Sequence, residues 1–478
     1  MQRIRASLPA AKCIDDIISA IQSHPVTIIR GATGSGKSTQ GPQYILESMI
    51  RNGKGSDANI ICTQPRRVAA IGVAERVAAE RNETVGDVVG YAVRGDTKVH
   101  QSRTKLLFCT TGVLLRRLHD DPELNGVSHV IVDEVHERSV DSDFLLILLR
   151  DIVRRRKSNS GIKVILMSAT LDADQFANYF KIEGLGKPRV LEIPGFTYPV
   201  RVLHIEDILR QFTDNRQILS NTAGATITNN DSRLLDDADD DIDYDTDEAD
   251  ADADSDSTQA GLKLWILPLH AGLTPREQAL VFKRPQSGRK VVLATNIAET
   301  SITIDDIEHV IDFGRVKESQ YNPRTRISCL VETFASRAAC RQRQGRAGRS
   351  RPGTCYKLFT RKLEQELMEA HQLPEIQRVP LTQLCLDLLS IGHSNIVEFL
   401  AQAIDPPPQK SVFAAISTLN DMGALIPNKS NAQWTLTPLG SAMARIPADV
   451  RIAKMLVLAA TMGCFEQVLS LTAVLSGP

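Results

Sequence analysis

The sequence predicts an α/β protein made of two parallel-sheet units followed by a mainly helical part. Three observations support this fold class. Short β-branched runs alternate with helical stretches through residues 1–200, the same alternation returns from Leu262 after a strongly acidic interruption, and the pattern beyond Arg361 is mostly helical. Strands that alternate with helical stretches are typical of a parallel sheet covered by helices.

The first unit, residues 1–200, contains apolar runs with the length and composition of buried strands. These runs are Val26–Arg30, Asn59–Thr63, Lys105–Cys109, His129–Val132 and Lys163–Met167. The carboxyl ends of parallel strands form the usual ligand-binding edge of such a sheet. Polar motifs that directly follow these runs are therefore expected to meet at one edge.

The first motif is a phosphate-binding loop. Residues 31–39 read GATGSGKST, which matches G-x-x-x-x-G-K-[ST], and a helix is expected over Gln40–Ile50. Glycines let backbone N–H groups face a phosphate chain, while Lys37 adds charge and the Ser38 hydroxyl can bind Mg²⁺. The residues expected to hold the nucleotide here are Gly31, Thr33, Gly34, Ser35, Gly36, Lys37, Ser38 and Thr39. The alternative, a glycine-rich turn without a ligand, fits the flanking strand and helix less well.

The second motif is a pair of acids at a strand end. Val130–Val132 is followed directly by Asp133 and Glu134, which is the Walker B arrangement. Asp133 is expected to hold Mg²⁺ directly or through water, and Glu134 to polarise the attacking water. The expected metal site is therefore formed by Ser38, Asp133 and Glu134. Paired acids at a strand end are otherwise helix caps or surface features, so catalysis is inferred from the phosphate loop upstream.

The charge distribution separates a linker from the folded parts. Residues 236–256 carry 13 carboxylates and no Lys or Arg, so the net charge of −1 becomes about +12 without them. A basic remainder suits a polyanion partner. We expect residues 201–261 to be a linker with a disordered acidic segment. A solvated spacer is the favoured role for this segment, and an electrostatic mimic of nucleic acid is the alternative.

Other features of the composition limit the class of protein. The eight cysteines show no paired C-x-x-C spacing, which argues against a disulfide or zinc framework. No apolar run reaches the length of a membrane span, and the N-terminus lacks a signal-peptide core. These features favour the cytosol or the nucleus.

The second unit, residues 262–361, repeats the strand pattern. Its expected strands are Lys263–Pro268, Lys290–Ala294, His309–Asp312 and Thr354–Phe359. A strand pair over Ala424–Ile426 and Trp434–Thr437 within helices predicts a winged-helix-like module over residues 362–445. Residues 446–478 predict helices that begin a bundle. Because these helices have no stop signal before Gly477, we expect the chain to end inside a domain.

Further motifs give the chain a family resemblance. In chain order, the motifs are TQPRRVAAIGVAERVA at 63–78, TTGVLLRRL at 110–118, DEVHER at 133–138, MSATL at 167–171, ATNIAETSITIDDI at 294–307 and QRQGRAGR at 342–349. This series resembles the DEAH/RHA family of superfamily 2 RNA helicases, and the DEVH variant resembles its cytosolic RHA-like branch. The resemblance implies two RecA-like domains that bind ATP and Mg²⁺ between them.

The resemblance also implies roles for residues outside the phosphate loop. Gln342 would orient the lytic water, and Arg346 and Arg349 would reach the γ-phosphate as arginine fingers, although a basic cluster can also contact RNA phosphates. Arg76 and Arg315 would sandwich the base. The residues implied to contact the RNA backbone are Arg66, Arg67, Thr111 and Thr300. A hairpin within 315–330, with Arg324 and Arg326, would be a duplex wedge or a plain surface hairpin.

The implied function is ATP hydrolysis coupled to 3′-to-5′ translocation on single-stranded RNA and duplex unwinding. The implied partners are single-stranded RNA of tolerant sequence and a ribonucleoprotein or the ribosome, with no membrane. Two alternatives stay open: a hydrolysis-impaired module that binds nucleotide and RNA, and a DNA translocase.

The sequence departs from the family in two places. The strand and helix that open the second domain and end in motif IV have no counterpart, because the only candidate, Ala223–Ile227, is too short and polar. Removing an interior strand exposes backbone donors and apolar surface, so the second domain is expected to be weakened. The family also continues beyond the point where this chain stops, which predicts a fragment or a gene-model error.

Overall fold

The computed structural model describes residues 5, 8–32, 34–156, 161–169, 173–195, 198–222, 264–270, 272–285, 288–299, 304–427 and 433–475. Several sequence expectations lie outside the described residues. They concern Thr33, Thr300, the candidate strand at 223–227 and the acidic run at 236–256. Within the described ranges, no helix is both long and apolar enough to cross a lipid bilayer.

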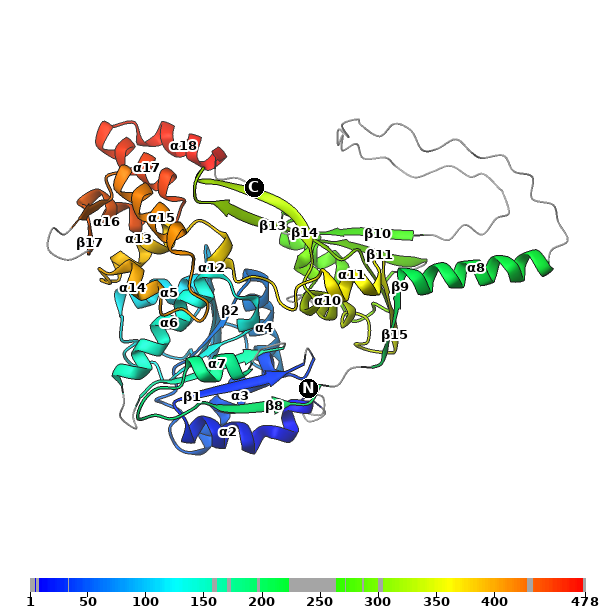
Figure 1. Ribbon diagram of the computed structural model, residues 1–478. Coiled ribbons are helices and arrows are strands. Elements are labelled where there is room, and N and C mark those ends of the chain that lie inside the picture. Colours follow the sequence, from blue (N-terminus) through cyan, green and yellow to red (C-terminus); the bar gives the residue numbers. More distant parts are fainter. Residues whose placement is uncertain are drawn as a thin grey trace, which may run out of the picture.

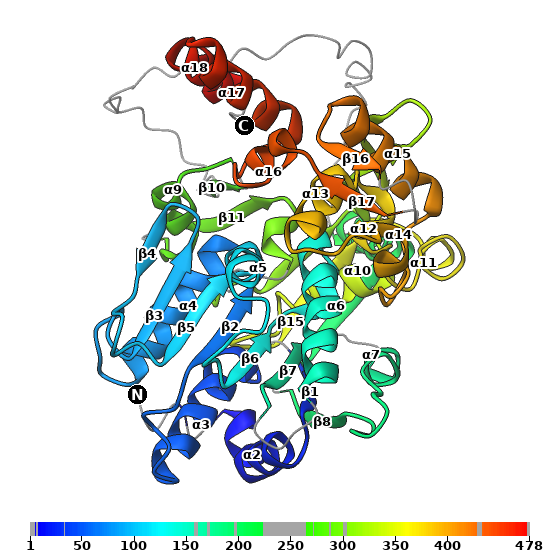
Figure 2. The ribbon, with the colours of Figure 1, turned by 90° about the vertical axis from the view of Figure 1, so that its left-hand side faces the viewer.

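The first lobe is built on an eight-stranded sheet in the order β4-β3-β5-β2-β6-β7-β1-β8 (Figure 2). Its strands are β1 (Val26–Gly31), β2 (Ile60–Gln64), β3 (Val89–Val93), β4 (Asp96–Lys98), β5 (Leu106–Thr110), β6 (His129–Val132), β7 (Lys163–Ser168) and β8 (Arg189–Ile193). All neighbouring strands are parallel except β3 and β4. The five strands expected from the sequence are confirmed to within a residue or two.

Helices cover both faces of this sheet, and the alternation of side chains explains why. Along β6, Val130 and Val132 belong to one buried cluster and Ile131 to the other. The lobe's helical elements are η1 (Pro9–Cys13), α2 (Ile14–Ser23), α3 (Lys37–Arg51), α4 (Arg67–Glu80), α5 (Thr111–Asp120), η2 (Val135–Glu137), α6 (Val140–Arg155) and α7 (Ala173–Tyr179). Burial of the strands on both faces is normal for a parallel sheet.

The second lobe has two separate small parallel sheets, β10-β11 and β12-β15-β9. Its strands are β9 (Val200–His204), β10 (Leu264–Leu269), β11 (Arg289–Ala294), β12 (His309–Asp312) and β15 (Gly353–Lys357). Its helical elements are α8 (Ile205–Thr222), α9 (Pro275–Ala279), η3 (Leu280–Phe282), η4 (Asn296–Ala298), α10 (Arg337–Gln344) and α11 (Arg361–Glu366). Helix α8 runs outward from β9 (Figure 1).

The start of the expected linker is therefore structured. Val200–His204 forms β9, which pairs with β15 from Val200↔Gly353 to His204↔Lys357, and α8 follows it. The sequence missed β9 because its mixed pattern of apolar and charged residues is typical of a half-buried edge strand, whose pairing partner lies far along the chain. The strand belongs to the second lobe, not to a linker.

Apolar side chains on the second lobe's strands are exposed. Leu293 on β11 is 61% exposed, Ile311 on β12 is 63% exposed, and Phe313 just after β12 is 69% exposed. Salt bridges tie the two strands at both ends: Lys290 Nζ lies 2.6 Å from Asp306, and Arg343 bonds both Glu299 and Asp312. Within the described residues, neither the outer edge of β11 nor that of β12 has a strand partner.

A long hairpin projects from the second lobe, as the sequence predicts. It consists of β13 (Arg315–Asn322) and β14 (Ile327–Phe334), paired antiparallel. Arg326 at its tip has φ 58° and binds Asp421 and Ser417 at 2.9 and 3.0 Å. Cys329 on β14 is the exposed thiol among eight free cysteines. The hairpin is thus fastened at its tip to the C-terminal part of the chain.

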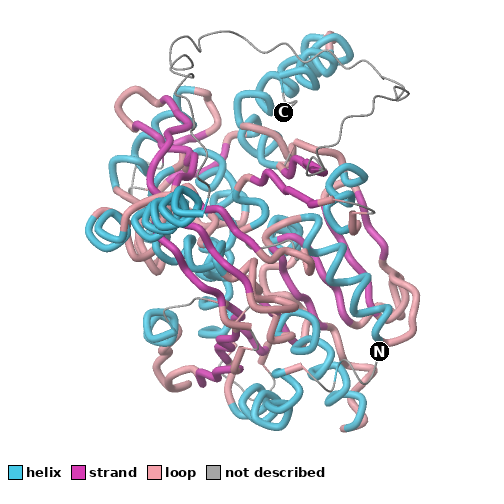
Figure 3. The backbone as a smooth tube through the Cα atoms, turned by 90° about the vertical axis from the view of Figure 1, so that its right-hand side faces the viewer, coloured by secondary structure: helices cyan, strands magenta, loops and turns pink. Residues whose placement is uncertain are grey.

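The C-terminal module packs on the first lobe. Its elements are α12 (Glu375–Arg378), α13 (Thr382–Ser390), α14 (Ile396–Leu400), α15 (Gln409–Asp421), β16 (Leu425–Pro427), β17 (Trp434–Leu436), α16 (Pro438–Ala444), α17 (Val450–Met462) and α18 (Phe465–Leu475). The expected β16–β17 pair is antiparallel. Phe144 of α6 and Phe399 of α14 meet edge to face at 5.9 Å, inside one core shared by lobe and module. Helices α17 and α18 lie at the module's outer end (Figure 3).

Candidate active site at the junction of the lobes

The phosphate loop lies between β1 and α3, where the sequence predicted it. Gly34 and Gly36 have φ of 83° and 88°, in a region that L-residues rarely adopt, so the glycines are required by the turn. Lys37 is the first residue of α3, and its side chain is only 5% exposed. The loop therefore presents a helix N-terminus and a buried ammonium to the same small volume.

One buried hydroxyl group of this loop has no hydrogen-bond partner among the described residues. It is the Ser35 hydroxyl oxygen, which is fully buried. A Cβ on Gly31 would lie 2.9 Å from that oxygen, so a larger residue would crowd the cradle. An unpaired buried hydroxyl is costly, which fits a loop built to bind polar phosphate oxygens.

Asp133 is buried at the carboxyl end of β6. Its Oδ2 accepts a 2.8 Å hydrogen bond from Gln64 Nε2, its Oδ1 accepts one from the Glu134 backbone N–H, and the Ser38 hydroxyl also bonds it. Burial, and then the charge of Glu134, raise the pKa of Asp133, while Lys37 opposes the rise. The hydroxyl of Ser38 and the carboxylate of Asp133 are oxygen donors of the kind that Mg²⁺ prefers, so the donor set fits that ion.

Glu134 connects the two motifs. Its Oε1 lies 3.3 Å from Lys37 Nζ, and its Oε2 lies 3.4 Å from His136 Nδ1. The Ser168 hydroxyl at the end of β7 lies 3.2 Å from the same His136 nitrogen. Burial, and then Lys37, lower the pKa of His136 to about 3, so the imidazole is neutral at physiological pH. Glu134 thus lies between a neutral imidazole and a cationic ammonium, and its Oε2 is buried without a hydrogen-bond partner among the described residues.

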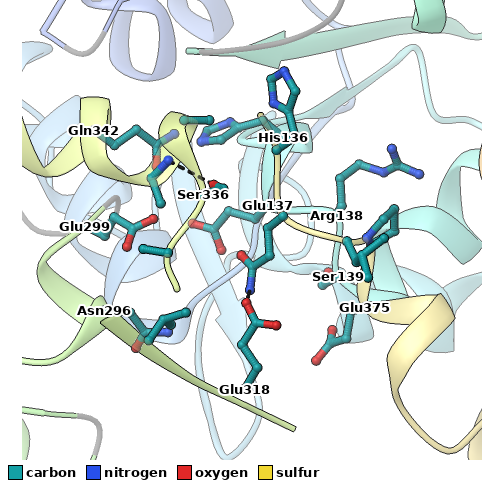
Figure 4. A pocket seen from close by; sticks show the side chains of 18 of the residues that line it. His136, Glu137, Arg138, Ser139, Asn296, Glu299, Glu318, Ser336, Gln342 and Glu375 are labelled. Carbon is teal, nitrogen blue, oxygen red and sulfur yellow. Dashed lines mark hydrogen bonds between the residues drawn. The ribbon is translucent and has the colours of Figure 1, made fainter. Parts of the chain in front are cut away.

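The second lobe brings arginines toward this site. Burial, and then Arg349, lower the pKa of Arg346 to about 9, while Glu134 of the first lobe opposes the change. The guanidinium of Arg346 is thus within electrostatic range of the Walker B acid. Burial also lowers the pKa of Arg349. Gln342 of α10 lines the same cavity as His136 (Figure 4).

Local contacts fix the helix that precedes these arginines. Ser336 caps α10 by accepting a hydrogen bond from the Ala339 N–H. Arg343, on the helix, donates to Glu299 at 3.1 Å and to Asp312 at 2.9 Å. These bonds anchor α10 to the chain after β11 and to the end of β12, so they hold Arg346 even though the sheet between those strands is interrupted.

The residues expected to sandwich a base have other partners. Arg76 Nε bonds Glu80 at 2.7 Å on α4, and Arg315 lies over the Phe334 ring at 4.3 Å. Both side chains are about half exposed. Their role as a base clamp stays a prediction.

Three of the four expected RNA contacts are described. Arg66 and Arg67 follow β2, and Thr111 follows β5, and these strands are parallel neighbours, so the three residues share one sheet edge. Arg67 is exposed, whereas Thr111 is 6% exposed. Arg66 is engaged elsewhere: it donates to the Ile297 carbonyl oxygen of the second lobe at 3.1 Å and lies 3.7 Å from Glu137.

Sequence reasoning missed the residues that support the motifs. They are Gln64, which bonds Asp133, His136 and Ser168 beside Glu134, Arg343, which anchors α10, and Arg138, which contacts Asp143 and Asp405. Several of these residues stand inside the quoted motifs. The motifs therefore pointed to these residues but did not show which residues they contact. The pairs Gln64–Asp133, Ser168–His136 and Arg138–Asp405 join distant parts of the chain.

Comparison with known proteins agrees with this geometry. Residues 11–178 match the family model described as DEAD/DEAH box helicase, and residues 245–351 match the helicase conserved C-terminal domain. The first match contains both acid-pair and phosphate-loop residues, and the second contains Gln342, Arg346 and Arg349. The two sides of the site therefore correspond to the two helicase domains, which are RecA-like.

Relatives align along the whole chain. The DExH-box ATP-dependent RNA helicase DExH1 of Arabidopsis thaliana is 38% identical over 539 positions, and DExH3 of the same plant is 39% identical over 541. The ATP-dependent DNA/RNA helicase DHX36 of Homo sapiens is 37% identical over 541 positions. All of this chain is covered, but it spans only 52%, 44% and 52% of these relatives respectively. With both helicase domains and these relatives, the chain belongs to the DEAD/DEAH-box helicase family.

Proposed function

We propose that this chain is an ATP-dependent RNA helicase, in which ATP hydrolysis drives 3′-to-5′ movement along single-stranded RNA and opens duplexes. The observation that carries the proposal is the opposition of Lys37 and Glu134 in one lobe to Arg346 in the other. A triphosphate bound between them would be touched from both lobes, so its hydrolysis would change how the lobes attract each other.

The chain's own residues supply the chemistry of hydrolysis. Lys37 and the N-terminus of α3 bind the outer phosphates, and this binding draws the ammonium away from Glu134. Glu134 then polarises a water held by Gln342, takes its proton, and the oxygen attacks the γ-phosphorus as the bond to ADP breaks. Arg346 and Arg349 stabilise the charge on the transferring phosphoryl group.

Ser38 and Asp133 would hold Mg²⁺, with Glu134 nearby as the third residue of the expected site. When bound, the ion would supply positive charge to the phosphate oxygens. The fit is supported by the buried Asp133 carboxylate and its Ser38 contact.

RNA is the proposed polymer, on the strength of the family resemblance and of the basic remainder of the chain outside the acidic run. Arg67 and Thr111 would contact sugar and phosphate, which gives affinity without sequence selection. Thr300 and Arg66 complete the proposed set. A ribonucleoprotein or ribosomal association and a cytoplasmic location belong to the same proposal and rest on the resemblance alone.

RNA-stimulated ATPase activity tests the proposal. Lys37→Ala should abolish turnover, and Arg346→Ala should lower kcat by about 10³-fold, because each loses charge that the transition state needs. Lys54→Ala, an exposed lysine beyond α3, is the matched control and should keep the parent rate. A Lys37→Ala protein that hydrolyses ATP like the parent would refute the assignment.

Two further measurements separate the alternatives. A chain that binds Mg·ATP and RNA but shows no turnover would be the hydrolysis-impaired binding module. Stronger stimulation by a DNA strand than by an RNA strand of the same sequence would favour a DNA translocase, because the 2′-hydroxyl distinguishes the two polymers.

A further inference from the structure

The segment that follows Glu134 has an unusual backbone. Glu134 has φ 52° and Arg138 has φ 50°, and both are non-glycine residues in the left-handed region on either side of η2. Such conformations are costly and persist only where surrounding contacts hold them. The contacts that hold this segment are therefore part of how Glu134 is positioned.

Arg138 is the main anchor at the far end of the segment. Its Nε and Nη2 donate to the two carboxylate oxygens of Asp143 at 2.8 and 3.0 Å, and its Nη2 lies 2.7 Å from Asp405 Oδ2. The Arg138 side chain is 12% exposed and that of Asp143 is 1% exposed. Asp143 belongs to α6 of the first lobe, whereas Asp405 follows α14 in the C-terminal module.

The same module also holds the backbone of this segment. The Glu375 N–H donates to the Arg138 carbonyl oxygen at 3.0 Å, and the Glu375 carboxylate accepts from the Val140 N–H at 3.0 Å. Gln175 of α7 donates to both oxygens of Asp405 at 3.2 and 3.3 Å, which fixes that carboxylate toward Arg138. The C-terminal module thus binds three groups near this segment: the Arg138 side chain, the Arg138 carbonyl oxygen and the Val140 N–H.

A neighbouring residue faces the second lobe. Glu137 lies 3.7 Å from Arg66, which donates to the Ile297 carbonyl oxygen of η4. Glu137, Arg138 and Glu375 line one cavity of about 500 Å³ between the lobes and the module (Figure 4). Glu134 therefore contacts Lys37 of the phosphate loop, Arg138 contacts the C-terminal module, and Glu137 is linked to the second lobe through Arg66.

We propose that Arg138 and Asp405 are positioning residues, which fasten the C-terminal module to the segment that carries Glu134 and so set the geometry of the hydrolytic acid. A buried ion pair is weak support for stability by itself, because its desolvation offsets its attraction, so a role in fixing one conformation accounts better for it. The proposal rests on the proposed ATP hydrolysis, in which Glu134 polarises the water.

The test replaces Asp405 by Asn and compares it with a matched carboxylate-to-amide change. Glu398→Gln is the control, since Glu398 is exposed on α14 and bonds Asn395 in its own cap. Asp405→Asn and Arg138→Lys should each lower kcat of the RNA-stimulated ATPase about tenfold, with KM for ATP changed less than twofold. The double variant should lose no more than the more damaging single variant, because both changes break one bridge.

A second readout does not depend on activity. Hydrogen exchange of the amides of residues 134–138 in the full chain should speed up about tenfold in Asp405→Asn and stay unchanged in Glu398→Gln. If the unaltered chain lacks ATPase activity, the proposed function fails, and this exchange result still decides the proposal. Unchanged exchange in Asp405→Asn, or a lowered Tm with normal kcat per folded molecule, would overturn it.

Discussion

The two lobes share one strand–helix repeat, but their sheets differ in completeness. Every residue of β2 in the first lobe is buried, whereas Leu293 on β11 and Ile311 on β12 of the second lobe are more than 60% exposed. Among the described residues, the first lobe has eight strands in one sheet, and the second has five strands in two small parallel sheets besides the β13–β14 hairpin. Parallel strands are normally covered on both faces, so the second lobe is stabilised differently.

The difference teaches that ion pairs supplement packing in the second lobe, whose two buried clusters have four residues each in the described part of the chain, whereas large buried clusters stabilise the first lobe. Lys290 with Asp306, and Arg343 with Glu299 and Asp312, join the ends of β11 and β12. The alignments with relatives extend over 539 to 541 positions, more than the 478 residues of this chain. This excess agrees with the expectation that a strand–helix unit has no counterpart here, which stays a prediction.

The largest difference should come from placing a lysine on a central strand of the first lobe and on an edge strand of the second lobe. Ile131→Lys on β6 should prevent folding, because Ile131 is 0% exposed and an unpaired buried ammonium costs several kcal/mol, roughly the whole stability of a domain. Ile311→Lys on β12 should change stability by less than about 0.5 kcal/mol, because Ile311 is 63% exposed. Soluble yield and circular dichroism measure both, and equal damage would contradict the comparison.

The same leucine-to-alanine change in each lobe should give a smaller difference in stability. Leu146 in α6 and Leu269 in β10 are both 0% exposed, but Leu269 belongs to a cluster of only four buried residues in the described part of the chain. Leu146→Ala should cost about 4 kcal/mol and Leu269→Ala about 2 kcal/mol, since a sparse surrounding relaxes more easily.

Urea unfolding can assign these losses to a lobe. Trp265 lies in β10 and Trp434 in β17, so fluorescence in a Trp434→Phe background reports the second lobe, while circular dichroism reports the whole chain. The fluorescence transition should occur at lower urea. Coincident transitions would show that the lobes unfold as one unit.

Acid should destabilise the well-packed lobe. Burial, and then Lys163, lower the pKa of His129 to about 4 from an ordinary 6.5, and its Nδ1 lies 3.0 Å from the Ser128 hydroxyl. The unfolded chain takes up this proton first, so stability is lost as pH falls from 6.5 toward 4, by about 2 kcal/mol between pH 7 and pH 5. His129→Gln should remove that part of the pH dependence, whereas the more exposed His119→Gln should not.

The smallest effect is expected where the hairpin of the second lobe meets the C-terminal module. The Arg326–Asp421 pair is 41% and 57% exposed, so Arg326→Met should cost less than about 1 kcal/mol. Hydrogen exchange of β13 and β14 should nevertheless speed up, because the tip loses its fastening. A large fall in global stability would mean that the pair is part of the shared core.

The sequence predicted the strands whose identity depends on local composition. His129–Val132 matches β6 at both ends, and the hairpin and the β16–β17 pair lie where they were expected. It missed the short polar strand β4, and β3, β8 and β9, which mix glycine, alanine or charged residues with apolar ones, because pairing with other strands stabilises them. The split of the second sheet is likewise a tertiary property.

The candidate active site also combines features that local sequence predicts with features that depend on tertiary contacts. Motif letters predicted Lys37, Asp133 and Glu134, and their contacts agree with that placement. The partners could not be predicted, because Gln64 reaches Asp133 and Asp405 reaches Arg138 only after the chain has folded. Chemistry is thus encoded locally, while the support of that chemistry depends on the fold.

The exposed thiol on the hairpin allows selective labelling of the protein. Cys329 is exposed, whereas the other seven cysteines are buried or partly covered, so a maleimide dye should react there first without any engineered residue. Because Cys329 pairs with Gln320 across the hairpin, a fluorophore at this position would report movements of the β13–β14 hairpin in a single-molecule recording.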